Sequence, residues 1–272
     1  MQEQHQEKKT QQQGQQHEGQ PSVMVSKVVP ARSGGVAKGV IASDRVAQTS
    51  AMFGLGLSPQ QSFTIVSLVE IPLPPGAIVF VTGPSGGGKS SILSLTAAKA
   101  AEAGHVVVQA SDLGSMRADA CVIDLIGDDL ERGMGLLSLV GLADAFVMLR
   151  RWEELSDGQR SRLMLARLLA RADELTSLDG ASGDEADRLS AVIVVDEFAS
   201  TLDRLTAKVI ARNVRRRIGK RGCRHTFVCA TTHDDLLESL RPDVVVWKGL
   251  RGEDVQVVMR SNRPREEAQM SS

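Results

Sequence analysis

The chain has 272 residues, of which 42% are hydrophobic and 24% charged, values typical of a globular protein able to bury a substantial core. Its net charge of −1 argues against a protein that coats nucleic acid as a polycation. Aromatic residues make up only 3% and Tyr is absent, which disfavours β-sandwiches, RNA-recognition sheets and aromatic grooves for single strands. The small aliphatic residues favour an α/β protein.

The cysteines and the apolar segments indicate the cellular compartment in which the protein is expected. Cys121, Cys223 and Cys229 form no metal-binding pattern, which suggests reduced thiols in a cytoplasmic protein. No stretch of 18 apolar residues occurs, and the N-terminus has no apolar segment of the signal-peptide type. We therefore expect a cytoplasmic protein without direct membrane insertion, for which any membrane role would need a separate partner.

Composition changes along the chain divide it into segments. Nine of the first twenty residues are Gln, which predicts a disordered tail over 1–22. An N-terminal extension follows over 23–61, with one or two weak strands and a helix near its middle. The main domain spans 62–260 and includes a helical subdomain at about 113–172. Residues 261–272 form a second disordered tail.

Strands and helices alternate along the main domain. Continuous apolar runs such as Ala77–Val81 are typical of strands covered on both faces. The alternation predicts a mostly parallel sheet flanked by helices. Predicted strands span 62–70, 77–81, 105–109, 191–195, 226–230 and 244–247. Predicted helices span 90–103, 158–171 and 202–218, and 117–153 is expected to be mainly helical.

A phosphate-binding loop follows the strand 77–81. Residues 83–90 match G-x-x-x-x-G-K-[ST] at every fixed position and precede a helix, as this motif requires. Glycines let successive N–H groups curl around an anion, and the helix dipole adds positive potential. Lys89 would contact the β- and γ-phosphates, and the Ser90 hydroxyl would bind Mg²⁺. The predicted loop ligands are Gly83, Pro84, Ser85, Gly86, Gly87, Gly88, Lys89, Ser90 and Ser91. The motif predicts an α/β P-loop NTPase.

An acidic pair follows the predicted strand 191–195. A buried strand that delivers carboxylates at its C-terminal end fits the general location of sites in α/β proteins. Asp196 is expected to hold Mg²⁺, and Glu197 to polarise the attacking water as general base.

Three further segments carry a resemblance to the ATP-binding-cassette (ABC) ATPases. Leu155–Gln159 resembles the family's LSGGQ signature, with Asp157 in place of a glycine. Residues 198–203 resemble its D-loop, and 230–234 resemble the segment that carries its switch histidine. With the two motifs above, the likeness covers about 76–250. It is nearest to soluble ABC ATPases that in some relatives are fused to a predicted acetyltransferase domain.

The resemblance implies a function and a partner. It implies Mg-dependent ATP binding and hydrolysis by a head-to-tail homodimer, in which each ATP lies between one phosphate loop and the partner's signature. ATP and Mg²⁺ are then the cofactors, 62–260 is the ATPase domain, and 113–172 is its helical signature subdomain. The further site residues implied are Ser156, Gly158 and Gln159 on the partner's γ-phosphate, Asp203 in the D-loop, His233 between γ-phosphate and Glu197, and Gln109 as sensor of Mg²⁺ and water.

Several alternatives stay open. Gln109 also fits a plain polar strand residue, and the basic run Arg212–Arg224 fits either a nucleic-acid contact or a solvated helix end. The chain could be the ATP-binding subunit of a transporter with separate membrane subunits, a mechanical ATPase with a protein or nucleic-acid partner, or a nucleotide-gated binding module. The short spacing from Ser90 to Gln109 lacks the β insertion of transporter domains, which disfavours the first.

Overall fold

The computed structural model describes residues 21–30, 43–52, 62–117, 119–177, 190–220, 222–251 and 254–260. The tail predicted at 1–22 lies almost entirely outside the described residues, and the tail at 261–272 lies wholly outside them.

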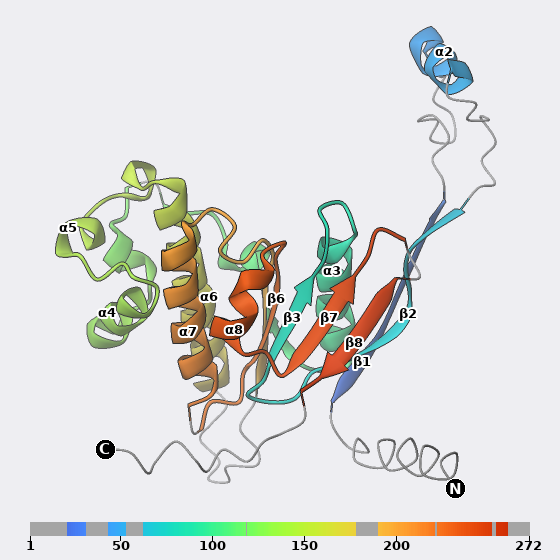
Figure 1. Ribbon diagram of the computed structural model, residues 1–272. Coiled ribbons are helices and arrows are strands. Elements are labelled where there is room, and N and C mark those ends of the chain that lie inside the picture. Colours follow the sequence, from blue (N-terminus) through green and yellow to red (C-terminus); the bar gives the residue numbers. More distant parts are fainter. Residues whose placement is uncertain are drawn as a thin grey trace, which may run out of the picture.

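A six-stranded sheet forms the centre of the molecule, in the order β4-β5-β6-β3-β7-β8 (Figure 1). The first five strands of this order pair in parallel, which confirms the predicted mostly parallel sheet, and β8 pairs antiparallel with β7. The strands are β3 (Ile78–Thr82), β4 (Val106–Val108), β5 (Ala191–Val195), β6 (Thr226–Ala230), β7 (Val244–Lys248) and β8 (Val255–Met259).

Helices and a ribbon cover the two faces of the sheet. Alternate residues of one strand enter different cores, so Ile78 and Phe80 join the helical side whereas Val79 and Val81 pack with α3. The described helices are α2 (Asp44–Met52), α3 (Lys89–Glu102), α4 (Leu130–Leu139), α5 (Ala145–Met148), α6 (Asp157–Ser177), α7 (Arg204–Ile218) and α8 (Leu237–Leu240). Figure 1 shows α4 to α7 at one side of the sheet and the β1–β2 ribbon at the other.

The ribbon connects the N-terminal segment to the main domain. β1 (Ser22–Pro30) pairs antiparallel with β2 (Ser62–Pro72), and Val23, Val25 and Val66 lie buried in the same core as α3. The strand predicted upstream therefore forms part of the same fold as the main domain, beside the helix that follows the phosphate loop.

The largest differences from the predicted elements lie in the region 117–153 and at strand β8. The region 117–153 is less helical than expected, because Gly127 and Gly141 adopt positive φ and separate short elements that begin at Asp129 and Asp144 caps. Strand β8 was not predicted. Its residues alternate between half-buried and exposed at the sheet edge, so the strand lacks a continuous apolar run.

A partly buried ionic cluster joins α4, α6 and α7 to the sheet. Asp173 of α6 accepts hydrogen bonds from Arg217 of α7 at 2.6 and 2.8 Å, and Arg132 of α4 lies 3.1 Å away. The His225 ring contacts Asp173 through Nε2 at 3.0 Å, and the Ala191 N–H donates to its Nδ1 at 3.3 Å. Neutral His225 can therefore donate from Nε2.

This cluster fixes the ionisation of Asp173. Burial by itself would raise the pKa of Asp173, but the hydrogen bond from His225 and the charge of Arg217 outweigh it and hold the pKa at about 2. The usual value is 3.8, so the folded state prefers the carboxylate and gains about 2 kcal/mol above pH 4.

Asp173 should therefore give the fold a defined acid sensitivity. Its contribution should be lost as the pH falls from about 4 to about 2, because the folded protein must then take up a proton that the unfolded chain binds more readily. Asp173→Asn should lower the free energy of unfolding by about 2 kcal/mol at neutral pH and flatten its decline in this window. Urea unfolding across pH measures both effects. The exposed Asp128→Asn variant is the control, and equal pH profiles for the two variants contradict the assignment.

Candidate functional site

The phosphate loop and the acidic pair open onto one cavity at the carboxyl ends of the parallel strands. The cavity measures about 440 Å³. Ser85, Lys89 and Ser90 line it from the loop after β3, and Asp196 and Glu197 line it from the turn after β5. The strand order places β6 between β3 and β5, so residues that follow β6 close the cavity. Two motifs more than a hundred residues apart thus share one site.

The loop has the conformation that the glycine pattern predicts. Gly83, Gly86 and Gly88 adopt φ of 138°, 75° and 95°, and Gly88 precedes α3 without a side-chain cap. A Cβ on Gly88 would lie 2.9 Å from Cγ2 of Ile65 on β2. The backbone at these three positions therefore favours glycine, and the uncapped start of α3 leaves N–H groups available for an anion.

Lys89 lies across the loop and is close enough to the acids of the site for their charges to affect its pKa. Its Nζ donates to the carbonyl oxygens of Gly83 at 2.9 Å and Pro84 at 2.8 Å. Burial lowers the pKa of Lys89, and the charges of three acids nearby act in the opposite direction, namely Asp196, Asp234 and Glu197. The ammonium group thus stands where it can bridge loop carbonyls and a bound phosphate.

The turn after β5 is held in an uncommon backbone conformation. Glu197 and Ala199 have φ of 50° and 57°, a region that L-residues adopt at a cost of about 1 kcal/mol or more. Phe198 anchors the turn: its N–H donates to the Ala230 carbonyl at 2.8 Å, and its buried ring packs edge-on against Phe227. This anchored turn places Asp196 and Glu197 in the lining of the cavity.

The oxygen donors of the cavity suit a hard cation. The Ser90 hydroxyl and the Asp196 carboxylate line the same cavity as Lys89, and hydroxyl and carboxylate oxygens are ligands that Mg²⁺ accepts. The Asp196 Oδ1 atom accepts a hydrogen bond from the Glu197 N–H at 2.9 Å, which orients the carboxylate. These residues would hold Mg²⁺, whose chemistry would be to neutralise charge on the β- and γ-phosphates.

The signature residues form a helix start away from this cavity. The Ser156 Oγ atom accepts from the Gln159 N–H at 3.3 Å, and the Gln159 Oε1 atom accepts from the Ser156 N–H at 3.0 Å. This reciprocal capping box leaves the Ser156 hydroxyl proton free to donate outward. Asp157 lies 3.5 Å from Arg160 within the same first turn. Gly158 packs against the D-loop, since a Cβ there would lie 3.2 Å from Leu202.

The other predicted residues lie outside the cavity lining. Asp203 caps α7 by accepting from the Thr206 N–H at 2.9 Å. Hydrogen bonding with the Thr206 side chain, and secondarily with its N–H, lowers the pKa of Asp203. His233 follows the cavity residues Thr231 and Thr232, but the described lining does not include it. Gln109 directly follows β4 rather than ending the strand as predicted, and its N–H donates to Asp112 at 2.9 Å. Their proposed roles on nucleotide remain predictions.

Sequence reasoning missed some residues that shape the site. Ser200, Thr231 and Thr232 line the cavity, and the two threonines could have been found from their position beside His233. Lys248 lies fully buried beneath the loop, with Nζ donating to Gly249 and Arg251 carbonyls at 2.6 Å each. Only the pairing of β3 with β7 reveals Lys248, and no sequence motif marks it.

The chain has the P-loop NTPase fold that the motif predicts, and solved structures share the architecture. The ATP-binding cassette MJ0796 bound to ADP and Pi, described as a dimer in a post-hydrolysis state, aligns with a TM-score of 0.54 over 75% of this chain and 95% of that one, at 15% identity. A second dimeric structure of MJ0796, described as a bacterial ABC transporter cassette, gives a TM-score of 0.52 at 16% identity and the same coverage. These likenesses confirm the predicted fold.

Curated relatives point to the same family. The aliphatic sulfonates import ATP-binding protein SsuB of Pectobacterium atrosepticum is 33% identical over 136 residues, 43% of this chain and 50% of the relative. The hemin import ATP-binding protein HmuV of Mesorhizobium japonicum is 26% identical over 213 residues, 66% and 74% respectively. The zinc import ATP-binding protein ZnuC of Jannaschia sp. is 30% identical over 131 residues, 44% and 54%.

The names of these three relatives support the resemblance to ABC ATPases that the motifs carry. The chain spans about half the length of SsuB and ZnuC. No protein-family model matches the chain, and none of these comparisons shows an acetyltransferase fusion. Within the described residues, no helix has the length and apolar character needed to cross a bilayer.

Proposed function

We propose that the chain binds and hydrolyses ATP with Mg²⁺ as a head-to-tail dimer of ABC type. The observation that carries this proposal is the single cavity that unites Lys89 and Ser90 with Asp196 and Glu197. Loop N–H groups and Lys89 would bind the triphosphate, Ser90 and Asp196 would hold the cation, and Glu197 would orient and deprotonate water.

The separation of the signature from this cavity supports the dimer. Ser156 is exposed at the start of α6 and does not line the cavity of its own chain. A helix start with a free hydroxyl donor suits a γ-phosphate that a second copy presents. Asp157 has an intrachain partner in Arg160, which moderates its charge near that phosphate.

Substitution of Ser156 tests the proposal. Ser156→Asp keeps a good N-cap for α6 but adds a charge opposite the partner's triphosphate. We expect ATP-dependent dimerisation to disappear and Mg-dependent turnover to fall at least about tenfold, while a monomer still binds ATP. Gel filtration with ATP, nucleotide titration and phosphate release measure these quantities.

Ser156→Asn is the matched control, because Asn has the size of Asp and also caps a helix well but carries no charge. It should dimerise with ATP. If the Asp and Asn variants dimerise and hydrolyse ATP equally, Ser156 does not face a partner's phosphate.

The ATP-binding subunit of an import system is a second candidate. The names of the three curated relatives favour it. In that case turnover should require a separate membrane subunit, whereas the first candidate hydrolyses ATP alone.

A further inference from the structure

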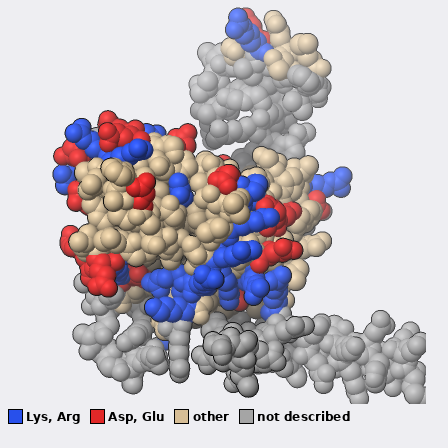
Figure 2. All heavy atoms as spheres, turned by 60° about the vertical axis from the view of Figure 1, so that its left-hand side comes forward, with Lys and Arg blue, Asp and Glu red and all other residues tan. Residues whose placement is uncertain are grey.

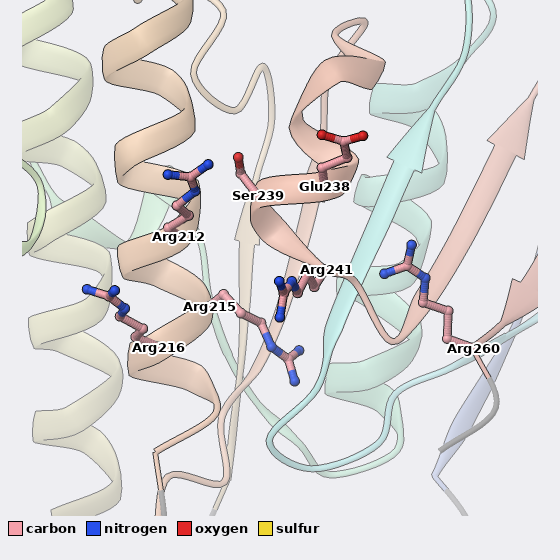
Figure 3. A pocket seen from close by; sticks show the side chains of 7 residues that line it. All are labelled: Arg212, Arg215, Arg216, Glu238, Ser239, Arg241 and Arg260. Atoms are coloured by element: carbon pink, nitrogen blue, oxygen red, sulfur yellow. The ribbon is translucent and has the colours of Figure 1, made fainter. Parts of the chain in front are cut away.

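An arginine-rich hollow of about 620 Å³ lies on the face formed by α7, α8 and the end of β8 (Figure 3). The residues that line it are Arg212, Arg215, Arg216, Glu238, Ser239, Arg241 and Arg260. Figure 3 shows the guanidinium groups spread across the opening, from α7 on one side to Arg260 on the other. Three separate elements therefore bring five arginines to one depression.

The hollow and the nucleotide cavity lie at opposite ends of the parallel strands. Arg241 precedes β7, and the Arg260 N–H donates to the Asp243 carbonyl at 2.9 Å beside it. The last turns of α7 lead toward the start of β6. These positions mark the amino ends of the parallel strands, whereas the phosphate loop follows the carboxyl end of β3. An occupant of the hollow would leave the nucleotide cavity accessible.

Most of this positive charge has no carboxylate partner. Arg215 pairs with Asp243 at 2.6 Å, but Arg212, Arg216 and Arg241 form no ion pair with any described residue. The same holds for Arg260. In a chain of net charge −1, such a concentration is local and favours a bound anion.

The C-terminus of α7 does not by itself account for the cluster. Cations in the last turn of α7 are favoured by the helix dipole, which explains Arg215 and Arg216. Arg241 lies at the C-terminus of α8, a helix of only 4 residues, and Arg260 follows β8, so neither side chain gains from the dipole of α7. The shared property of these side chains is the depression that they surround.

The positive surface extends beyond one hollow. Arg216 also lines a second depression, of about 390 Å³, between α4 and α7. Lys220 continues it, together with the polar side chains of Ser138 and Asn213. Arg217 also lines this depression, but its guanidinium is paired with Asp173. Figure 2 shows Lys and Arg side chains gathered in a band across this side of the molecule. We call the two hollows together the basic surface. An elongated track suits a linear polyanion better than one small anion.

The side chains of the basic surface select among linear polyanions. Arginine presents paired N–H donors that match phosphate oxygens. No aromatic side chain lines either hollow among the described residues, so bases of a single strand find no stacking platform. The lining offers one half-buried apolar side chain, Leu139, and thus little that would insert into a membrane. We propose that the basic surface binds the phosphate backbone of double-stranded nucleic acid without reading its sequence.

The test measures binding of fluorescent double-stranded DNA to the full chain at several salt concentrations. Each phosphate contact contributes about −0.9 to the slope of log K against log salt. Arg212→Ala with Arg216→Ala should make the slope less steep by about 2 and weaken binding about tenfold at low salt. Basal ATP hydrolysis should not change, because neither arginine lines the nucleotide cavity.

The matched control is Arg150→Ala with Arg151→Ala, which removes the same charge from exposed positions ahead of the signature. This control should bind DNA like the wild type. Equal binding by both double variants overturns the proposal. So does Arg212- and Arg216-dependent binding to phosphatidylserine vesicles or to an acidic peptide when duplex DNA does not bind. If the wild-type protein binds DNA but hydrolyses no ATP, the proposed function is contradicted and the DNA-binding proposal is not.

Discussion

Glu197→Gln should lower Mg-dependent ATP turnover at least about a hundredfold, because a general base contributes roughly 10²- to 10⁴-fold to such reactions. The amide keeps the size of the side chain but cannot accept the proton of water. Since Glu197 lines the cavity at its acidic end while Lys89 and Ser90 line the other side, ATP binding should persist. The variant should then accumulate as an ATP-bound dimer, which gel filtration and phosphate release together detect.

The uncommon backbone of Glu197 makes its control important. Gln occupies φ of 50° no more easily than Glu, so the substitution leaves the conformational cost nearly unchanged. Glu102→Gln removes an exposed carboxylate of α3 that pairs with Lys99 and lies outside the cavity lining. It should hydrolyse ATP at the wild-type rate. If Glu197→Gln does so as well, Glu197 is not the base.

Local patterns predicted the parts of the site that follow single strands. The apolar run at 77–81 and the glycine spacing after it identified β3 and its loop, and the acids after 191–195 identified the second wall. Both predictions depend on one rule, that parallel strands bring their carboxyl ends to one edge. This rule brings distant motifs together without knowledge of the strand order.

Contacts between segments far apart in the sequence could not be predicted from local patterns. The pairing of β3 with β7 places Thr82 opposite Trp247, so the first residue of the loop meets the backbone of Lys248. Neither the strand order nor this approach leaves a periodic signal in the sequence. The basic surface is similar: the run Arg212–Arg224 was visible, but Arg241 and Arg260 join it only in three dimensions.

Replacement of Gly83 by Ala should be the most damaging single change in the loop. A Cβ at Gly83 would lie 1.9 Å from the Lys248 carbonyl oxygen, and φ there is 138°. That carbonyl cannot easily retreat, because the parallel β3–β7 register extends to the preceding residue pair. We expect the free energy of unfolding to fall by about 3 kcal/mol or more, with loss of ATP binding.

Gly86→Ala is the matched comparison within the same loop. Gly86 has φ of 75°, and a Cβ there would meet no atom within 4 Å. Only the left-handed backbone then opposes the side chain, at about 1 kcal/mol. Urea unfolding and ATP titration of the two variants separate overlap from backbone strain. Because the β3–β7 pairing causes the overlap, equal stability of the Gly83 and Gly86 variants would mean that Lys248 does not press against the loop, and that the loop is shaped by its own glycines alone.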